Sequence, residues 1–182
     1  MKKIIIGMLL ALLAIPATMV AQNTLSATAS ASVVIPITIV DNSGLTGGTT
    51  LNFGAVALDL ANSGTVTVST QNVRTVGGGI TAVASTSTST ASFGVTGTAG
   101  KTYAITLPAD GTITVVSTTN PANSMAVDQF KARPASAGAD QLTGNIGAAG
   151  SDSFTVGATL TVAAGQAEGI YNGSFSVSAN YN

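Results

Sequence analysis

The most regular pattern of apolar and polar positions lies in the stretch YNGSFSVSANYN, which spans residues 171–182. Tyrosine, glycine, phenylalanine, valine and alanine occupy the odd positions, and serine and asparagine occupy the even positions. Side chains of a β-strand point alternately to opposite faces, so this alternation predicts a half-buried strand over about residues 169–181.

A second alternating run, LSATASASVVIPITI, covers residues 25–39. Pro36 lies within this run and removes one ladder hydrogen bond, which suits an edge strand or a strand end better than a central strand. One face of the predicted strand carries Leu25, Ala27, Ala29, Ala31, Val33, Ile35, Ile37 and Ile39.

Six shorter runs of β-rich sequence lie between these two and are separated by Gly, Asn and Pro. They cover residues 64–70, 91–97, 101–108, 111–117, 124–132 and 153–162. Stretches near 51–57 and 72–84 add one or two candidates, and no segment after residue 21 has a convincing helical period. Strands spaced by about ten residues predict an all-β fold, an antiparallel β-sandwich of about 8–10 strands.

The first residues predict export. Lys2 and Lys3 precede a twelve-residue apolar run, Ile4–Ile15, and Ala17 and Ala21 supply small residues for cleavage. These features predict a signal peptide over residues 1–21 and a single secreted domain over residues 22–182. The run is shorter than the roughly 20 residues of a membrane-spanning helix, so we expect no stable membrane span after cleavage. The expected location is the periplasm, the cell surface or the medium, reached through the inner membrane.

Composition predicts a weakly charged domain with a light core. The chain has six basic and seven acidic residues, and loss of Lys2 and Lys3 with the signal leaves four against seven, a net charge of −3. No basic patch is available for phosphates, so nucleic acid is not an expected partner. The chain has five Phe, three Tyr and no Trp. Such a domain would gain stability by burying more surface against a neighbour.

The sequence lacks the residues of most catalytic and metal sites. It contains no His and no Cys, which excludes Ser–His–Asp and Cys–His catalysis, the usual zinc sites and disulfides. The acidic residues occur singly beside Asn, Gly or Ser, as in solvated turns. The glycines at 77–79 and at 144, 147 and 150 are not followed by Lys, so they predict loops rather than phosphate sites. We therefore expect no enzyme activity and no catalytic, cofactor-binding or metal-binding residues.

Four stretches resemble the bacterial secreted family catalogued as domain of unknown function 4402. These are LNFGAV (51–56), FGVTGTAGKTYAITLP (93–108), MAVDQF (125–130) and FTVGATLTVAAGQAEGIYNGSFSVSANYN (154–182). The resemblance implies an exported, β-rich, adhesin-like or pilin-like domain, and it brings no catalytic residues. The most specific positions are Gly157, Gln166, Gly169, Tyr171, Gly173 and Tyr181.

The last strand also resembles the final strand of chaperone–usher pilin subunits, which carry a glycine fourteenth from the end and a penultimate tyrosine. Gly169 and Tyr181 hold these two positions. The resemblance implies an immunoglobulin-like or pilin-like sandwich whose last strand borders an open groove. A periplasmic chaperone fills that groove first, and the N-terminal strand of the next subunit replaces it. The implied assembly residues are Ala31, Val33, Ile35, Ile37, Ile39, Gly169, Tyr171, Phe175, Val177 and Tyr181. The absence of a disulfide and the presence of Pro36 depart from the pilin pattern.

Periodicity leaves two interpretations of the alternating runs open. In one, residues 25–39 lie outside the core of their own domain and complete the sheet of a neighbour by β-strand addition. This favours a structural, fimbria-like or adhesin-like subunit whose partners are further copies, homologous subunits or a chaperone. In the other, both runs are strands of one closed sandwich, and the protein is a monomeric secreted binding module for glycan or protein.

Overall fold

Every regular element in the described part of the chain is a β-strand, as predicted. The computed structural model describes residues 30–41, 49–84 and 86–182, so the predicted signal peptide and residues 25–29 lie outside the described ranges. No helix in these ranges is long and apolar enough to cross a membrane. The strands are β1 (Thr38–Asp41), β2 (Val56–Leu58), β3 (Gly64–Val68), β4 (Arg74–Gly78), β5 (Ile80–Ala82), β6 (Ala91–Thr96), β7 (Thr102–Thr106), β8 (Ile113–Ser117), β9 (Ser124–Pro134), β10 (Thr143–Asn145), β11 (Ser151–Val162), β12 (Tyr171–Asn172) and β13 (Ser178–Tyr181).

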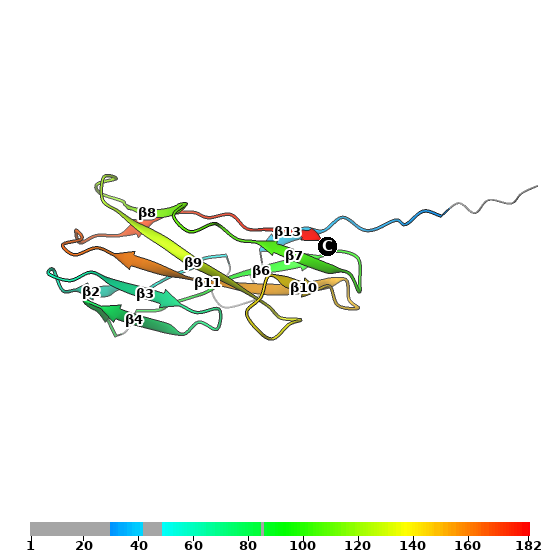
Figure 1. Cartoon of the computed structure of the whole chain (residues 1–182), viewed down its shortest axis with the longest axis horizontal. Coiled ribbons are helices and arrows are strands. Elements are labelled where there is room, and N and C mark those ends of the chain that lie inside the picture. The colour runs from blue at the N-terminus through cyan, green and yellow to red at the C-terminus, as the bar shows by residue number, and fades with distance from the viewer. Residues whose placement is uncertain (1–29, 42–48, 85) are drawn as a thin grey trace, which may run out of the picture. The chain divides into compact units, whose positions relative to one another are not determined.

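The twelve-residue strand β11 is the centre of the main sheet. Its first half pairs with β6 and its second half with β3, while β9 follows both halves along the other edge. The sheet continues outward to β1 beyond β6, to β4 beyond β3, and to β8 and β12 beyond β9, and all pairings are antiparallel. Figure 1 shows β11 and β9 crossing the middle of the domain. This arrangement places alternate β11 side chains, from Phe154 to Val162, in the core.

A β-bulge changes which β9 side chains point inward. Gly157 of β11 pairs with Lys131, but Thr159 pairs with Asp128, so two β9 residues lie opposite one β11 residue. Gln129 takes up the extra length with a φ of 52°. Because a bulge reverses the alternation, Val127 before it and Phe130 after it both face the core.

Two small sheets form the opposite layer. β7 pairs with β10 and β13, and β2 pairs with β5. Tyr103 of β7 packs in one buried cluster with Phe154, while Ile80 of β5 packs in a second cluster with Leu160. Gly144 of β10 is needed beside Tyr103, because a Cβ there would overlap the tyrosine ring. The fold is therefore an antiparallel, sandwich-like all-β domain.

The predicted runs match the observed strands closely, with four differences. The short strand β10 has no alternating pattern and was not predicted. The last run forms two strands, β12 and β13, because its two ends pair with different partners. Within the described part of the 25–39 run, only β1 forms a strand, and it extends to Asp41. The stretches near 51–57 and 72–84 give three strands, β2, β4 and β5, rather than one or two, so the described ranges contain thirteen strands.

Candidate functional site

The C-terminal run keeps the alternation that its sequence predicts. Tyr171, Phe175, Val177 and Tyr181 are half-buried, and Ala179 is buried. Every even-numbered residue from 172 to 182 is exposed. One face of this run therefore contacts the core while the other, rich in Ser and Asn, faces solvent.

Residues 173–177, here called the bridging segment, belong to neither ladder. Before it, Asn172 pairs with Val116; after it, Ser178 pairs with Thr106. Between these two pairs the C-terminal run has five residues (173–177), whereas the facing β7–β8 connection has nine (107–115). The longer connection must therefore loop away from the bridging segment. The backbone groups of residues 174–176 consequently make no hydrogen bond to any other residue in the described part of the chain.

A second backbone edge lies within residues 49–53, at Leu51. Asn52 exchanges two backbone hydrogen bonds with Ser89, at 2.9 and 3.1 Å. In an extended strand, successive backbone groups point to opposite edges, so those of Leu51 point away from Ser89. No residue in the described ranges forms a backbone hydrogen bond with Leu51. Extended backbone with free hydrogen-bonding groups is a template for another strand.

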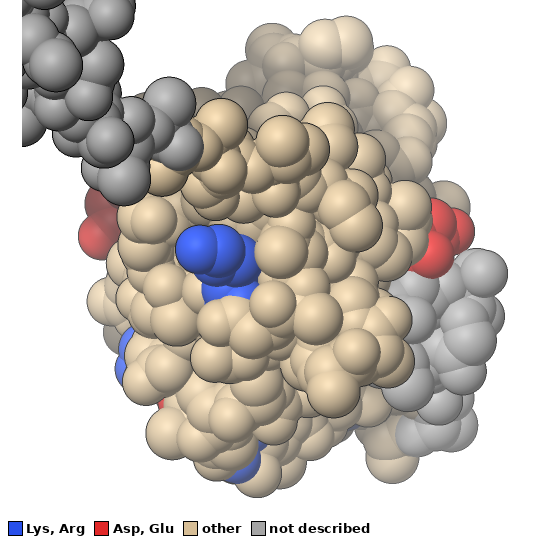
Figure 2. Space-filling model, turned by 90° about the vertical axis from the view of Figure 1, so that its right-hand side faces the viewer, with Lys and Arg blue, Asp and Glu red and all other residues tan. Residues whose placement is uncertain are grey.

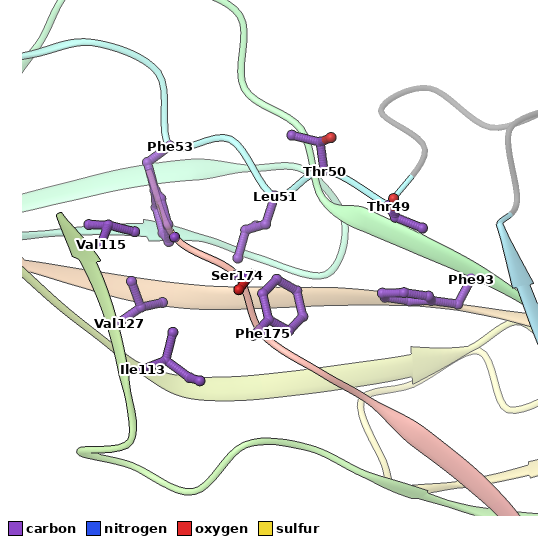
Figure 3. A pocket seen from close by; sticks show the side chains of 11 residues that line it. Thr49, Thr50, Leu51, Phe53, Phe93, Ile113, Val115, Val127, Ser174 and Phe175 are labelled. Carbon is purple, nitrogen blue, oxygen red and sulfur yellow. The ribbon is translucent and has the colours of Figure 1, made fainter. Parts of the chain in front are cut away.

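An apolar cleft of about 330 Å³ lies between residues 49–53 and the bridging segment. Figure 3 shows Leu51 and Phe175 pointing into it from opposite sides. None of its lining residues carries a charge, and the large apolar ones other than Val127 are only half-buried. The cleft is lined by Thr49, Thr50, Leu51, Phe53, Phe93, Ile113, Val115, Val127, Gly173, Ser174 and Phe175.

A second cleft, of about 360 Å³, lies on the other side of the bridging segment, beside Leu107 and Pro108. Ser174 and Phe175 line both clefts. The Phe175 ring also packs against Phe130, with ring centroids 5.1 Å apart. The bridging segment is therefore held to the core mainly through apolar contacts and has open space on both sides.

A tyrosine clamp formed by Tyr181, Ile35 and Thr98 lies beyond the bridging segment, at the end of β13. The Tyr181 hydroxyl donates to the Ile35 carbonyl oxygen at 2.6 Å and accepts from the Thr98 amide at 2.6 Å. The Ile35 amide donates to Thr98 Oγ1 at 2.7 Å. Gly97 permits this contact, because a Cβ there would overlap the Tyr181 hydroxyl. The clamp fastens the end of β13 to the segment that precedes β1.

The described part of the N-terminal run divides into an exposed and a half-buried portion. Ala31 is exposed, Val33 is 93% exposed and Ile35 is 64% exposed. Ile37 and Ile39 instead pack against the core cluster that contains Phe154. The expectation that the whole run lies outside its own core therefore fails at Ile37 and Ile39, because β1 completes the β6 edge.

The structure brings only some of the predicted assembly residues together. Phe175 lies at both clefts, Val177 at the second cleft, and Tyr181 meets Ile35 in the clamp. Tyr171 instead stabilises the preceding loop by accepting from Gln166 Nε2 and donating to the Ala167 carbonyl oxygen. Gly169 also lies in that loop, where its φ of 150° favours glycine.

Sequence reasoning missed most of the cleft. Leu51 and Phe53 flank Asn52 with the spacing of one strand face, so their shared orientation could have been inferred. Their position opposite Phe175 could not, because no local pattern connects the two segments. The other missed residues are Phe93, Thr98, Ile113, Val115 and Val127.

The site offers apolar surface and backbone hydrogen-bonding groups rather than charge. Figure 2 shows charged side chains as isolated spots on a face that is otherwise uncharged. In the ranges that the structure describes, no three His, Cys, Asp or Glu side chains come together as metal ligands. Asp110 and Asp128 accept the backbone amides of Gln129 and Gly111, so they fasten the β7–β8 connection to β9.

Fold and cleft together define a class: an all-β, sandwich-like domain with a gap in its strand pairing. The chain belongs to the family described as Domain of unknown function (DUF4402), whose model matches residues 43–181. The matched region contains both edges of the cleft and starts after β1. No curated protein and no solved structure gives a significant match.

Proposed function

We propose that this protein is a non-enzymatic exported surface protein, a fimbria-like or adhesin-like structural subunit that assembles by β-strand addition. The observation that carries the proposal is the uncharged apolar cleft between residues 174–176 and Leu51, whose backbone groups form no hydrogen bond with another residue in the described ranges. A strand placed between these edges would gain main-chain hydrogen bonds from both and bury alternate side chains in the cleft.

The energetics favour an apolar strand as occupant. Burial of apolar surface contributes about 25 cal/mol per Å², and the half-buried aromatic rings of the cleft leave such surface available. Each added backbone hydrogen bond contributes about 0.5–1.5 kcal/mol. An uncharged strand avoids the cost of removing an ion from water.

The chain itself contains a suitable strand. Residues 22–40 carry no charge, and residues 25–33 alternate between apolar and polar positions. The described part of this run up to Ile35 is exposed on its own domain. We therefore favour a second copy of this chain, or a homologous subunit, as the partner, with a periplasmic chaperone as a transient one.

Deletion tests the proposal. The mature protein, residues 22–182, should form multimers whose size rises with concentration in light scattering, and a variant lacking residues 22–34 should remain a folded monomer. Replacement of residues 22–34 by a Gly/Ser sequence of equal length keeps the length of the segment but removes its apolar side chains. This variant should also remain a folded monomer. A wild type that stays monomeric, with neither change altering it, would overturn the proposal.

A monomeric secreted binding module for glycan or protein is the second candidate. The cleft volume lies at the lower end of the 300–1,000 Å³ range typical of ligand pockets. In that case the deletion variant keeps its ligand and no multimer forms.

Export has an independent test. If residues 1–21 are the signal peptide, N-terminal sequencing of the protein recovered outside the inner membrane should begin at Gln22. Recovery of intact Met1 in that fraction would contradict this part of the proposal.

A further inference from the structure

The tyrosine clamp limits which residues of the N-terminal run can reach another subunit's cleft. Ile35 is fixed to its own domain by Tyr181 and Thr98. A strand advances about 3.3 Å per residue, so Val33 stays within about 7 Å of that anchor, whereas Leu25 can lie about 33 Å away. A residue that enters the cleft of a second domain must therefore come from the beginning of the run.

Side-chain size selects among those residues. The cleft has room for a large side chain between Leu51 and Phe175. From residue 22 to residue 32, Leu25 is the one large aliphatic residue, and positions 27, 29 and 31 on its face are alanines. An alanine methyl group would leave most of the cleft empty, so Leu25 fits it best.

The clamp also gives a reference for the direction of the added strand. It anchors Ile35 beside Tyr181, on the C-terminal side of the bridging segment, whereas a strand from a second copy lacks this anchor and enters from the Gly173 end. Its N-terminal residues then point toward Tyr181, and it runs antiparallel to the bridging segment. The run of the same chain, anchored at Ile35, would instead reach its own cleft from the Tyr181 side and run parallel to the bridging segment.

We propose that residues 22–31 of a second copy pair antiparallel with the bridging segment and that Leu25, the specificity-determining residue, fills the cleft beside Phe175. This inference rests on the proposed function and adds the partner segment, its direction and its register. With Leu25 opposite Phe175, Ser26 lies opposite Ser174 in the antiparallel arrangement and opposite Ser176 in the parallel one. All three serines are on the polar face of their runs.

Engineered disulfides distinguish the two arrangements, because the chain contains no cysteine and a disulfide forms only when the Cβ atoms lie about 3.5–4.5 Å apart. The double variant S26C/S174C should give a ladder of disulfide-linked multimers on a non-reducing gel. The matched variant S26C/S176C should give no ladder. An intramolecular disulfide in S26C/S176C would overturn the inference, because it would place the run in its own cleft.

Shortening the side chain of residue 25 tests the role of Leu25. Leu25→Ala should raise the dissociation constant of the multimer at least about 30-fold, whereas Ser26→Ala should leave it unchanged. If the wild type assembles but neither Leu25→Ala nor the S26C/S174C pair behaves as expected, the register is overturned and the proposed function stands. If the wild type does not assemble at all, both are overturned.

Discussion

The hydroxyl group of Tyr181 donates a 2.6 Å hydrogen bond to the carbonyl oxygen of Ile35, which lies 146 positions earlier in the chain. The Tyr181 hydroxyl oxygen itself accepts a hydrogen bond from the Thr98 amide, so one side chain links three segments. This contact fastens the last strand of the second layer to the segment before β1 of the main sheet. It therefore fixes where the exposed N-terminal segment leaves the domain.

Removal of the Tyr181 hydroxyl should loosen this link without emptying the space that the ring fills. Tyr181→Phe loses one donated and one accepted hydrogen bond, each worth about 0.5–1.5 kcal/mol, so the free energy of unfolding should fall by about 1–3 kcal/mol in urea titration. The Ile35 amide should also exchange faster with deuterium. Asn180→Ala, at an exposed neighbouring position, is the control, and equal losses in the two variants would contradict a role for the hydroxyl.

The N-terminal run should respond to charge differently on the two sides of Pro36. Ile37→Asp places a carboxylate against the Phe154 cluster and should lower the free energy of unfolding by at least about 2 kcal/mol. Val33→Asp, at a position that is 93% exposed, should change stability little. Circular dichroism melts of both variants would check this. A stable Ile37→Asp domain would mean that Ile37 is not part of its own core.

Two phenylalanines that contact the core, Phe154 and Phe175, should differ in their contribution to stability. Phe154 is 1% exposed, and Phe154→Ala should cost about 3–5 kcal/mol. Phe175 is only half-buried between two clefts, so Phe175→Ala should cost less, about 1–2 kcal/mol, because less surface is lost from the core. Ser176→Ala on the exposed face should be nearly neutral. Equal costs for the two phenylalanines in a denaturant titration would rule out this description of the bridging segment.

Stability at high pH should depend on Tyr103. Burial raises the pKa of the Tyr103 hydroxyl well above its ordinary value, and its hydrogen bond to Asp152 Oδ2 at 2.9 Å and the charge of that carboxylate raise it further. The unfolded chain ionises this tyrosine near pH 10, whereas the folded domain does not. The stability from the neutral hydroxyl is therefore present below about pH 10 and is lost as the pH rises toward the raised pKa.

Thermal melts between pH 8 and 11 would measure this loss. Tyr103→Phe should start less stable at neutral pH, because Asp152 loses a donor, but should lose less stability above pH 10. If the melting temperatures of the wild type and the variant fell in parallel with rising pH, groups other than Tyr103 would cause the loss of stability at high pH.

The sequence predicted local structure well wherever the period of two is unbroken. The β11 alternation from Phe154 to Val162 and the C-terminal alternation both hold in the structure. The reason is that strand geometry alone sends successive side chains to opposite faces. The same rule could not reveal the bulge at Gln129, because an extra residue in β9 is recognisable only against the register of β11.

Sequence by itself determined the β-class, the family membership, the low charge, the lack of His and Cys and the polarity of the strand faces where the alternation is unbroken. Tertiary structure alone decided that Ile37 and Ile39 belong to their own core, that residues 174–176 have no backbone partner among the described residues and that Leu51 faces Phe175 across a cleft. These features depend on which strand edges meet and on the length of the chain between them. A nine-residue stretch opposite a five-residue one leaves a gap whatever the side chains are.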